Sequence, residues 1–216
     1  MDVSTAVDRR SSIRAFLDTP VPDEAIAELL TKASRSPSGG NVQPWRIYIV
    51  NGESMTRFRE MLAGRDIEEA AYDIYPAGLK EPYKTARFEL GMQMYDLLGI
   101  ARDDKAGRFG QMLKNYEFFG APAAIFCFAD RQMGPPQWSD LGMFLQTFML
   151  LAQEAGIDTC PQEAWAMWEG AISEFVGAPD DERLFCGVAI GHADPNATVN
   201  TLRSERFPLE EFATFV

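Results

Sequence analysis

The segment that most constrains the fold lies around residues 140–155, because its hydrophobic side chains surround the whole helix that it predicts. Ser139 is a suitable N-cap for a helix from Asp140 to Ala155, and Gly156 is a typical helix end. The apolar positions are Leu141, Met143, Phe144, Leu145, Phe148, Met149, Leu150 and Leu151. A helix that is apolar all round must be buried on every side. In a chain of 216 residues we expect part of that burial to come from a second subunit.

Hydrophobic periodicity and turn residues divide the rest of the chain into short elements. Helices are predicted over 2–16, 23–35, 53–63, 87–98, 103–117 and 166–176, and strands over 46–50, 123–128 and 184–190. Residues 64–86 are rich in loop formers, and the tail 200–216 has little periodicity although its apolar side chains need burial. Helices that alternate with few strands are typical of an α+β fold, so we expect one domain over residues 1–216.

Charge and residue counts exclude several classes of protein. The net charge of −12 argues against nucleic acid as a partner, since a phosphate backbone needs a basic face. The three cysteines include no C-x-x-C pair, which indicates neither a disulfide framework nor a zinc site. His192 is the only histidine, so one chain cannot form a two-histidine metal site, and no G-x-S-x-G motif completes a hydrolase triad.

Two further absences concern location and nucleotide binding. Residues 1–16 are charged throughout, and the longest apolar stretch, 141–152, is too short to span a bilayer. We therefore expect a cytoplasmic protein with no membrane partner. Neither G-x-G-x-x-G after a strand nor G-x-x-x-x-G-K-[ST] occurs, so the sequence indicates no Rossmann or P-loop site.

A cluster of cations stands out in this acidic chain, at Arg9-Arg10-Ser11-Ser12-Ile13-Arg14. Guanidinium groups match the geometry of a phosphate, and serine hydroxyls supply further donors. On a helix, Arg10 and Arg14 would share a face because they are four residues apart. The cluster fits a phosphate site, and it fits a solvated basic helix end equally well.

Three other polar segments could contribute to a site. Residues 36–45 combine small residues with the side-chain amides of Asn41 and Gln43, which can hydrogen-bond to the edge of a ring that carries donors and acceptors. Alternatively, they form an ordinary helix-to-strand turn. Residues 156–165 place Gln162 and Glu163 directly after a proline, or they link two helices. Residues 200–208 add two arginines, or they belong to a solvated tail.

The order of these four segments resembles the nitroreductase family, whose members use FMN. R-R-S-S-I-R-A-F at 9–16 precedes P-S-G-G-N-V-Q-P-W at 37–45, G-I-D-T-C-P-Q-E-A-W at 156–165 and N-T-L-R-S-E-R-F-P at 200–208. The resemblance runs from about residue 4 to the C-terminal tail. It implies a three-layer α+β fold with a mostly antiparallel central sheet flanked by helices. It also implies a homodimer whose C-terminal tails are exchanged between the subunits.

The resemblance further implies two FMN sites at the dimer interface. The implied FMN-binding residues of one subunit are Arg10, Ser11, Ser12 and Arg14 on the phosphate and ribityl side, Pro161, Gln162 and Glu163 along the ring edge, and Arg203 and Arg206 in the tail. Those implied for the partner subunit, facing the ring, are Pro37, Ser38, Gly39, Asn41 and Gln43. Which of the two tail arginines contacts the phosphate stays open. Ala164 and Ser204 depart from the family pattern, and no catalytic side chain and no metal ligand is implied.

The activity implied by the resemblance is a ping-pong transfer of electrons from NADH or NADPH, through FMN, to a nitroaromatic or quinone-like acceptor. Two alternatives stay open. The same fold could support another flavin reaction, such as reduction of flavins or enones, reductive dehalogenation, or oxygen-dependent destruction of the flavin. The chain could also be a flavin-binding protein without turnover.

Overall fold

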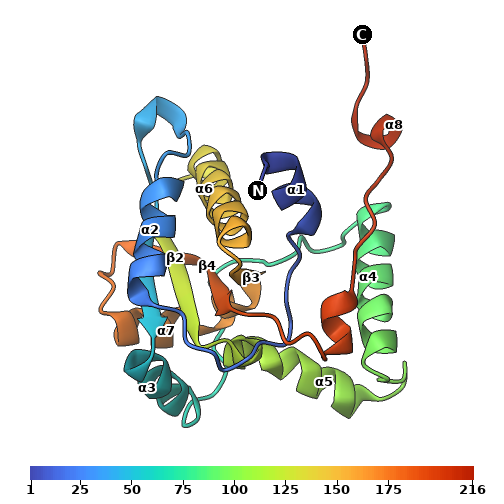
Figure 1. Ribbon diagram of the computed structural model, residues 1–216, viewed down its shortest axis with the longest axis horizontal. Helices are drawn as coiled ribbons and strands as arrows, with labels where there is room; N and C mark the ends of the chain where they lie inside the picture. Colours follow the sequence, from blue (N-terminus) through green and yellow to red (C-terminus); the bar gives the residue numbers. More distant parts are fainter.

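A computed structural model describes residues 1–216, and four antiparallel strands form its central sheet (Figure 1). The strands are β1 (Arg46–Asn51), β2 (Ala123–Asp130), β3 (Asp158–Gln162) and β4 (Glu182–Gly191), in the order β1-β2-β4-β3. The three predicted strands are confirmed with slightly extended ends. The interpretation of 156–165 as a link between helices is wrong, because this segment contains β3.

Alternating side chains along β2 separate the two faces of the sheet. Ile125 and Cys127 belong to one cluster of buried residues, whereas Ala124 and Phe126 belong to the other. The first face is covered by α2 (Asp23–Ala33) and α6 (Pro135–Glu154). The second is covered by α3 (Glu53–Leu62), α7 (Glu169–Val176) and the 3-10 helices η2 (Lys114–Gly120) and η3 (Glu163–Trp168). The predicted three-layer α+β fold is confirmed.

Helix α6 begins earlier than the sequence predicted. Gly134 is its N-cap and Pro135 its first residue, a position that proline favours because it has no N–H to donate. The predicted cap is wrong, since the Ser139 hydroxyl lies inside the helix and donates to the Pro136 carbonyl at 2.6 Å. In the single chain one side of α6 is buried against α2 and the sheet, while Met143 on another side is 40% exposed.

The N-terminal helix is much shorter than the predicted span of 2–16. Helix α1 (Val3–Arg9) ends where the backbone of Arg10 turns to ψ 125°. Ser12 then forms a parallel bridge with Thr159 of β3, and the Ile13 amide donates to the Thr159 carbonyl at 3.0 Å. This backbone pairing with β3 takes the place of the predicted second half of the helix.

The remaining helices lie at one side of the sheet or in the tail. Helices α4 (Tyr83–Leu97) and α5 (Lys105–Leu113) confirm two predicted helices with shifted ends, and α4 buries none of its residues. The predicted helix 166–176 is divided between η3 and α7. After η4 (Thr198–Thr201), the tail with α8 (Leu209–Phe212) extends away from the body of the chain in Figure 1. No helix has both the length and the hydrophobicity needed to cross a membrane.

Candidate functional site

The arginine segment and the C-terminal tail meet beside β3. Burial lowers the pKa of Arg10, and the nearby charge of Arg206 lowers it further. The Arg203 guanidinium donates to the Ser11 hydroxyl at 3.2 Å. Two segments from opposite ends of the chain therefore bring their cations to one place, as the family resemblance implied.

The backbone of residues 10–14 is extended, so successive side chains lie on opposite sides of it. Arg10, Ser12 and Arg14 lie near the buried Cys160 thiol. Burial raises the pKa of that thiol to about 11, and the two arginines and the Ser12 hydroxyl oppose the shift. Ser11, at the intervening position, bonds Arg203 instead. The two arginines share a side, as predicted, but through the two-residue period of a strand rather than through a helix.

Arg10, Arg14 and Arg206, which lies beside Arg10, have no carboxylate partner within ion-pair distance. Arg14 donates to the Ser12 carbonyl at 3.2 Å, and Arg206 donates to the Ser204 carbonyl and hydroxyl at 2.9 and 2.6 Å. Arg10 and Arg14 are partly buried and Arg206 is exposed beside them. Neighbouring positive charges without counterions repel one another, and a dianionic phosphate would relieve that repulsion. The residues present therefore fit the phosphate of FMN.

Strand β3 leads from this cation cluster to the predicted ring edge. Ser12 bridges Thr159, and Gln162 lies three residues further along the strand, or about 10 Å at the rise of an extended chain. Gln162 is only 3% exposed. Its amide donates to the Asn115 carbonyl at 2.8 Å and accepts from the Trp165 indole at 3.3 Å. Both ends of its side chain are thus occupied by protein, and Asn115 is a partner that the sequence did not suggest.

Glu163 follows at the start of η3, and its carboxylate has no ion-pair partner. Burial raises its pKa above the ordinary value. Tyr72, which lies near Glu163, donates a hydrogen bond from its hydroxyl to the Phe185 carbonyl. It comes from residues 64–86, which the sequence predicted only as loop. That segment is fixed to η3 by backbone bonds from the Glu68 and Ala71 amides to the Met167 and Ala166 carbonyls. It is fixed to α7 because the Glu68 carboxylate accepts two α7 amides at 2.8 Å each. Sequence reasoning missed Tyr72 and Glu68 because no local pattern marks them.

Residues 37–43, which were predicted to face the flavin ring, lie away from the arginine cluster of the same chain. In Figure 1 the loop between α2 and β1 projects beyond the start of α6, on the side away from the tail and α4. The Gly39 amide faces the buried Asp140 carboxylate of α6 at 3.3 Å. Asn41 and Gln43 adopt positive φ values of 57° and 52°, which are uncommon for residues with side chains. One chain therefore does not bring Pro37, Ser38, Gly39, Asn41 and Gln43 to its own arginine cluster.

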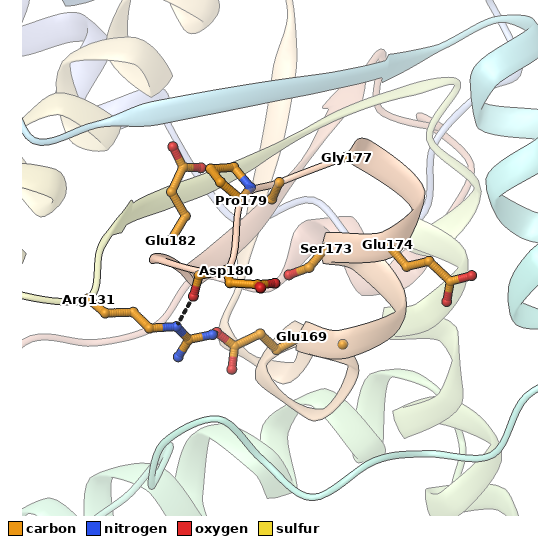
Figure 2. Close-up of a pocket in the computed structure, with 10 residues that line it drawn as sticks. Arg131, Glu169, Ser173, Glu174, Gly177, Pro179, Asp180 and Glu182 are labelled. Atoms are coloured by element: carbon orange, nitrogen blue, oxygen red, sulfur yellow. Dashed lines mark hydrogen bonds and ion pairs between the residues drawn. The ribbon is translucent and has the colours of Figure 1, made fainter.

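A separate hollow of about 490 Å³ lies beside α7, and Figure 2 shows its lining. Most of its charged residues are acidic. Its one cation, Arg131, contacts the Glu169 carboxylate at 2.9 Å and donates to the Asp180 carbonyl at 2.9 Å. A pocket with this charge does not suit an anionic ligand, so it is not a second phosphate site.

Comparison with known structures identifies the class of protein that this fold defines. The structure superposes on an FMN and NADPH-dependent nitroreductase, NfnB from Sphigopyxis sp. strain HMH, with a TM-score of 0.96 and 46% identity, covering 100% of this chain and 99% of the other. It also matches the FMN-dependent nitroreductase NfnB from Mycobacterium smegmatis, solved in complex with NADPH, with a TM-score of 0.91, 30% identity and full coverage of both chains.

Sequence comparison gives the same result. A profile of the Nitroreductase family matches residues 7–192. The chain is 35% identical to a 4-nitrobenzoate reductase of Pseudomonas putida, over 100% of this chain and 96% of that protein. It is 36% identical to a chloronitrobenzene nitroreductase of Comamonas testosteroni, over 97% of this chain and 94% of that protein. The chain belongs to the nitroreductase family and is an oxidoreductase of the nitroreductase type.

Proposed function

We propose that residues 1–216 form one FMN-binding domain that passes electrons from NADH or NADPH to nitroaromatic or quinone-like acceptors. The observation that carries this proposal is the uncompensated cluster of Arg10, Arg14 and Arg206 at one end of β3. These arginines would hold the FMN phosphate. Ser12 would add a hydroxyl donor on the same side. The hydrogen bond between Arg203 and Ser11 would hold the tail against the segment on the opposite side.

The other end of β3 would orient the flavin ring. The backbone from Pro161 to Ala164 lies at this end, and the buried side chain of Gln162 fixes it to Asn115 and Trp165. When bound, FMN supplies the redox chemistry, since it takes two electrons from a nicotinamide cofactor and gives them to an acceptor in a second half-reaction. The protein's part is to bind, orient and shield, and no side chain needs to act as a nucleophile.

We also propose that the active form is a homodimer, in which the loop with Asn41 and Gln43 faces the FMN of the other subunit. Two features of the single chain support this. Phe212 and Phe215 in the tail are 69% and 90% exposed, which is unfavourable for aromatic side chains in water. Strand β1 is an open sheet edge with Ile49 42% exposed, so an exchanged tail could pair there. Light scattering that finds a stable monomer with bound FMN would contradict this arrangement.

The names of the relatives suggest the substrates to test. The NfnB proteins are described as NADPH-dependent or were solved with NADPH, and the curated relatives are named for 4-nitrobenzoate and chloronitrobenzene. We therefore propose NADPH as electron donor and a substituted nitrobenzene as acceptor. A cytoplasmic location stays a prediction, which cell fractionation would check.

The test begins with the colour of the purified protein. We expect bound FMN, bleaching of its visible absorbance by NADPH or NADH without oxygen, and recovery when a nitroarene is added. Steady-state rates with 4-nitrobenzoate, nitrobenzene, a quinone, an enone and free FMN would then rank the acceptors. A protein that takes up no FMN would refute the proposal, and bleaching without reaction with any nitroarene would favour another flavin reaction.

A further inference from the structure

Besides the exposed bond from Arg203 to Ser11, the Asn200 side chain joins the two segments that form the arginine cluster. The side-chain oxygen Oδ1 of Asn200 accepts a hydrogen bond from the Arg14 backbone amide at 2.9 Å. Its amide nitrogen donates to the Ala15 carbonyl at 2.8 Å and to the Asp194 carbonyl at 3.0 Å. Both donors and one acceptor site of the asparagine are therefore used, across a sequence separation of 186 residues from Arg14.

Asn200 also lies where the tail leaves the body of the chain. It belongs to η4, in which Val199 is 4% exposed and the Thr198 hydroxyl donates to the Leu97 carbonyl of α4 at 3.2 Å. The backbone carbonyl of Asn200 accepts a further hydrogen bond from the Arg203 guanidinium at 3.1 Å. This anchored turn sets the point from which the tail runs to Arg206.

We propose that Asn200 is the positioning residue of the phosphate site, because it fixes the spacing between the segment of Arg10 and Arg14 and the segment of Arg206. It contacts protein only and would not touch the phosphate. Neighbouring guanidinium groups repel each other, so an unfilled site without this link would let its two halves separate. FMN binding would then have to bring them together again, and affinity for the phosphate would fall. The inference rests on the proposed FMN site.

The test compares FMN with riboflavin, which has the same ring but no phosphate. For Asn200→Ala we expect the dissociation constant for FMN to rise about tenfold or more, and that for riboflavin to change less than about threefold. Flavin fluorescence measures both constants on the apoprotein. The matched control is Asn196→Ala in the same loop, because the Asn196 side chain is exposed and only its backbone amide makes a hydrogen bond. This control should leave both constants at the wild-type value.

A second variant distinguishes a local effect on the site from a general loss of folding. Asn200→Ser is smaller but keeps a hydroxyl that can retain one of the three bonds, so its FMN affinity should lie between those of the wild type and Asn200→Ala. Equal weakening of FMN and riboflavin in either variant would overturn the inference, because it would show a general role in the fold. Unchanged FMN affinity would also overturn it. Failure of the wild-type protein to bind FMN would instead refute the proposed function.

Discussion

Substitution of Gly187 by alanine should destabilise the fold at the part of the sheet that supports the predicted ring edge. Gly187 lies on β4 between Phe126 of β2 and Gln162 of β3. An added Cβ would lie 2.4 Å from Cδ1 and 2.9 Å from Nε1 of Trp165, whereas ordinary contacts of a Cβ begin at 3.4 Å. The methyl group would therefore overlap the indole by 1.0 Å (3.4 − 2.4).

Trp165 has no room to move away from this methyl group. It is fully buried, and its ring centroid lies 4.4 Å from that of Phe118, 5.5 Å from that of Phe126 and 5.6 Å from that of Phe58. Overpacking of a core costs about 1–3 kcal/mol. Displacement of the indole would also break its bond to Gln162, which adds about 1 kcal/mol. We therefore expect Gly187→Ala to lower the free energy of unfolding by about 2–4 kcal/mol.

Thermal unfolding followed by near-ultraviolet circular dichroism measures this effect. In a chain of this size 1 kcal/mol corresponds to about 2–4 °C, so the midpoint should fall by about 4–16 °C. The matched control is Gly110→Ala in α5, where an added Cβ meets nothing within 4 Å. Alanine in a helix should raise stability there by about 0.5–1 kcal/mol. A Gly187→Ala protein that melts at the wild-type temperature would refute the packing argument.

Three further predictions concern the site itself. Arg10→Ala and Arg206→Ala should each weaken FMN binding by about 1.5–3 kcal/mol, or about 10- to 150-fold, while the melting temperature of the apoprotein does not fall, because each change relieves repulsion. A lower apoprotein melting temperature would contradict this. Ser12→Ala should weaken FMN binding more than Ser11→Ala, since only Ser12 lies on the side of Arg10; equal dissociation constants would argue against the extended backbone. Because burial raises the pKa of Glu163, its contribution to the unfolding free energy is complete below the ordinary value of 4.5 and is lost as pH rises through the folded pKa. Glu163→Gln should therefore gain stability relative to wild type as pH rises above about 4.5, and a constant difference between the two melting temperatures would refute the assignment.

The sequence predicted those elements whose own residues carry the signal. Strands β2 and β4 are apolar runs bounded by turn residues, and the three-layer arrangement follows from helices around few strands. Strand β3 was missed because it contains Asp158, Pro161 and Gln162 and so has no apolar alternation. Its position at the sheet edge explains why proline is tolerated, since an edge strand need not use every backbone N–H in the ladder.

The residue types of the candidate site could be predicted from the sequence, but the residues that hold them in position could not. Arginines, serines and amides lie in four short segments and can be recognised by type and order. Asn115, Tyr72 and Asn200 have roles only through partners that are 47, 113 and 186 positions away in the chain. No local pattern distinguishes such residues from ordinary loop positions, because the contact that gives each its role exists only after folding.

The arginine segment shows how a correct residue pairing can follow from an incorrect local structure. A spacing of four places two side chains on one side of a helix and also on one side of a strand. The sequence prediction that Arg10 and Arg14 act together therefore does not depend on the helix, which is absent. The intervening residues do depend on it: on an extended backbone Ser12 joins the arginines, while Ser11 turns to Arg203. Pairing with β3 thus places the Ser12 hydroxyl, and not that of Ser11, on the side of the proposed phosphate site. The tail supplies one arginine to each side, Arg203 at Ser11 and Arg206 at Arg10.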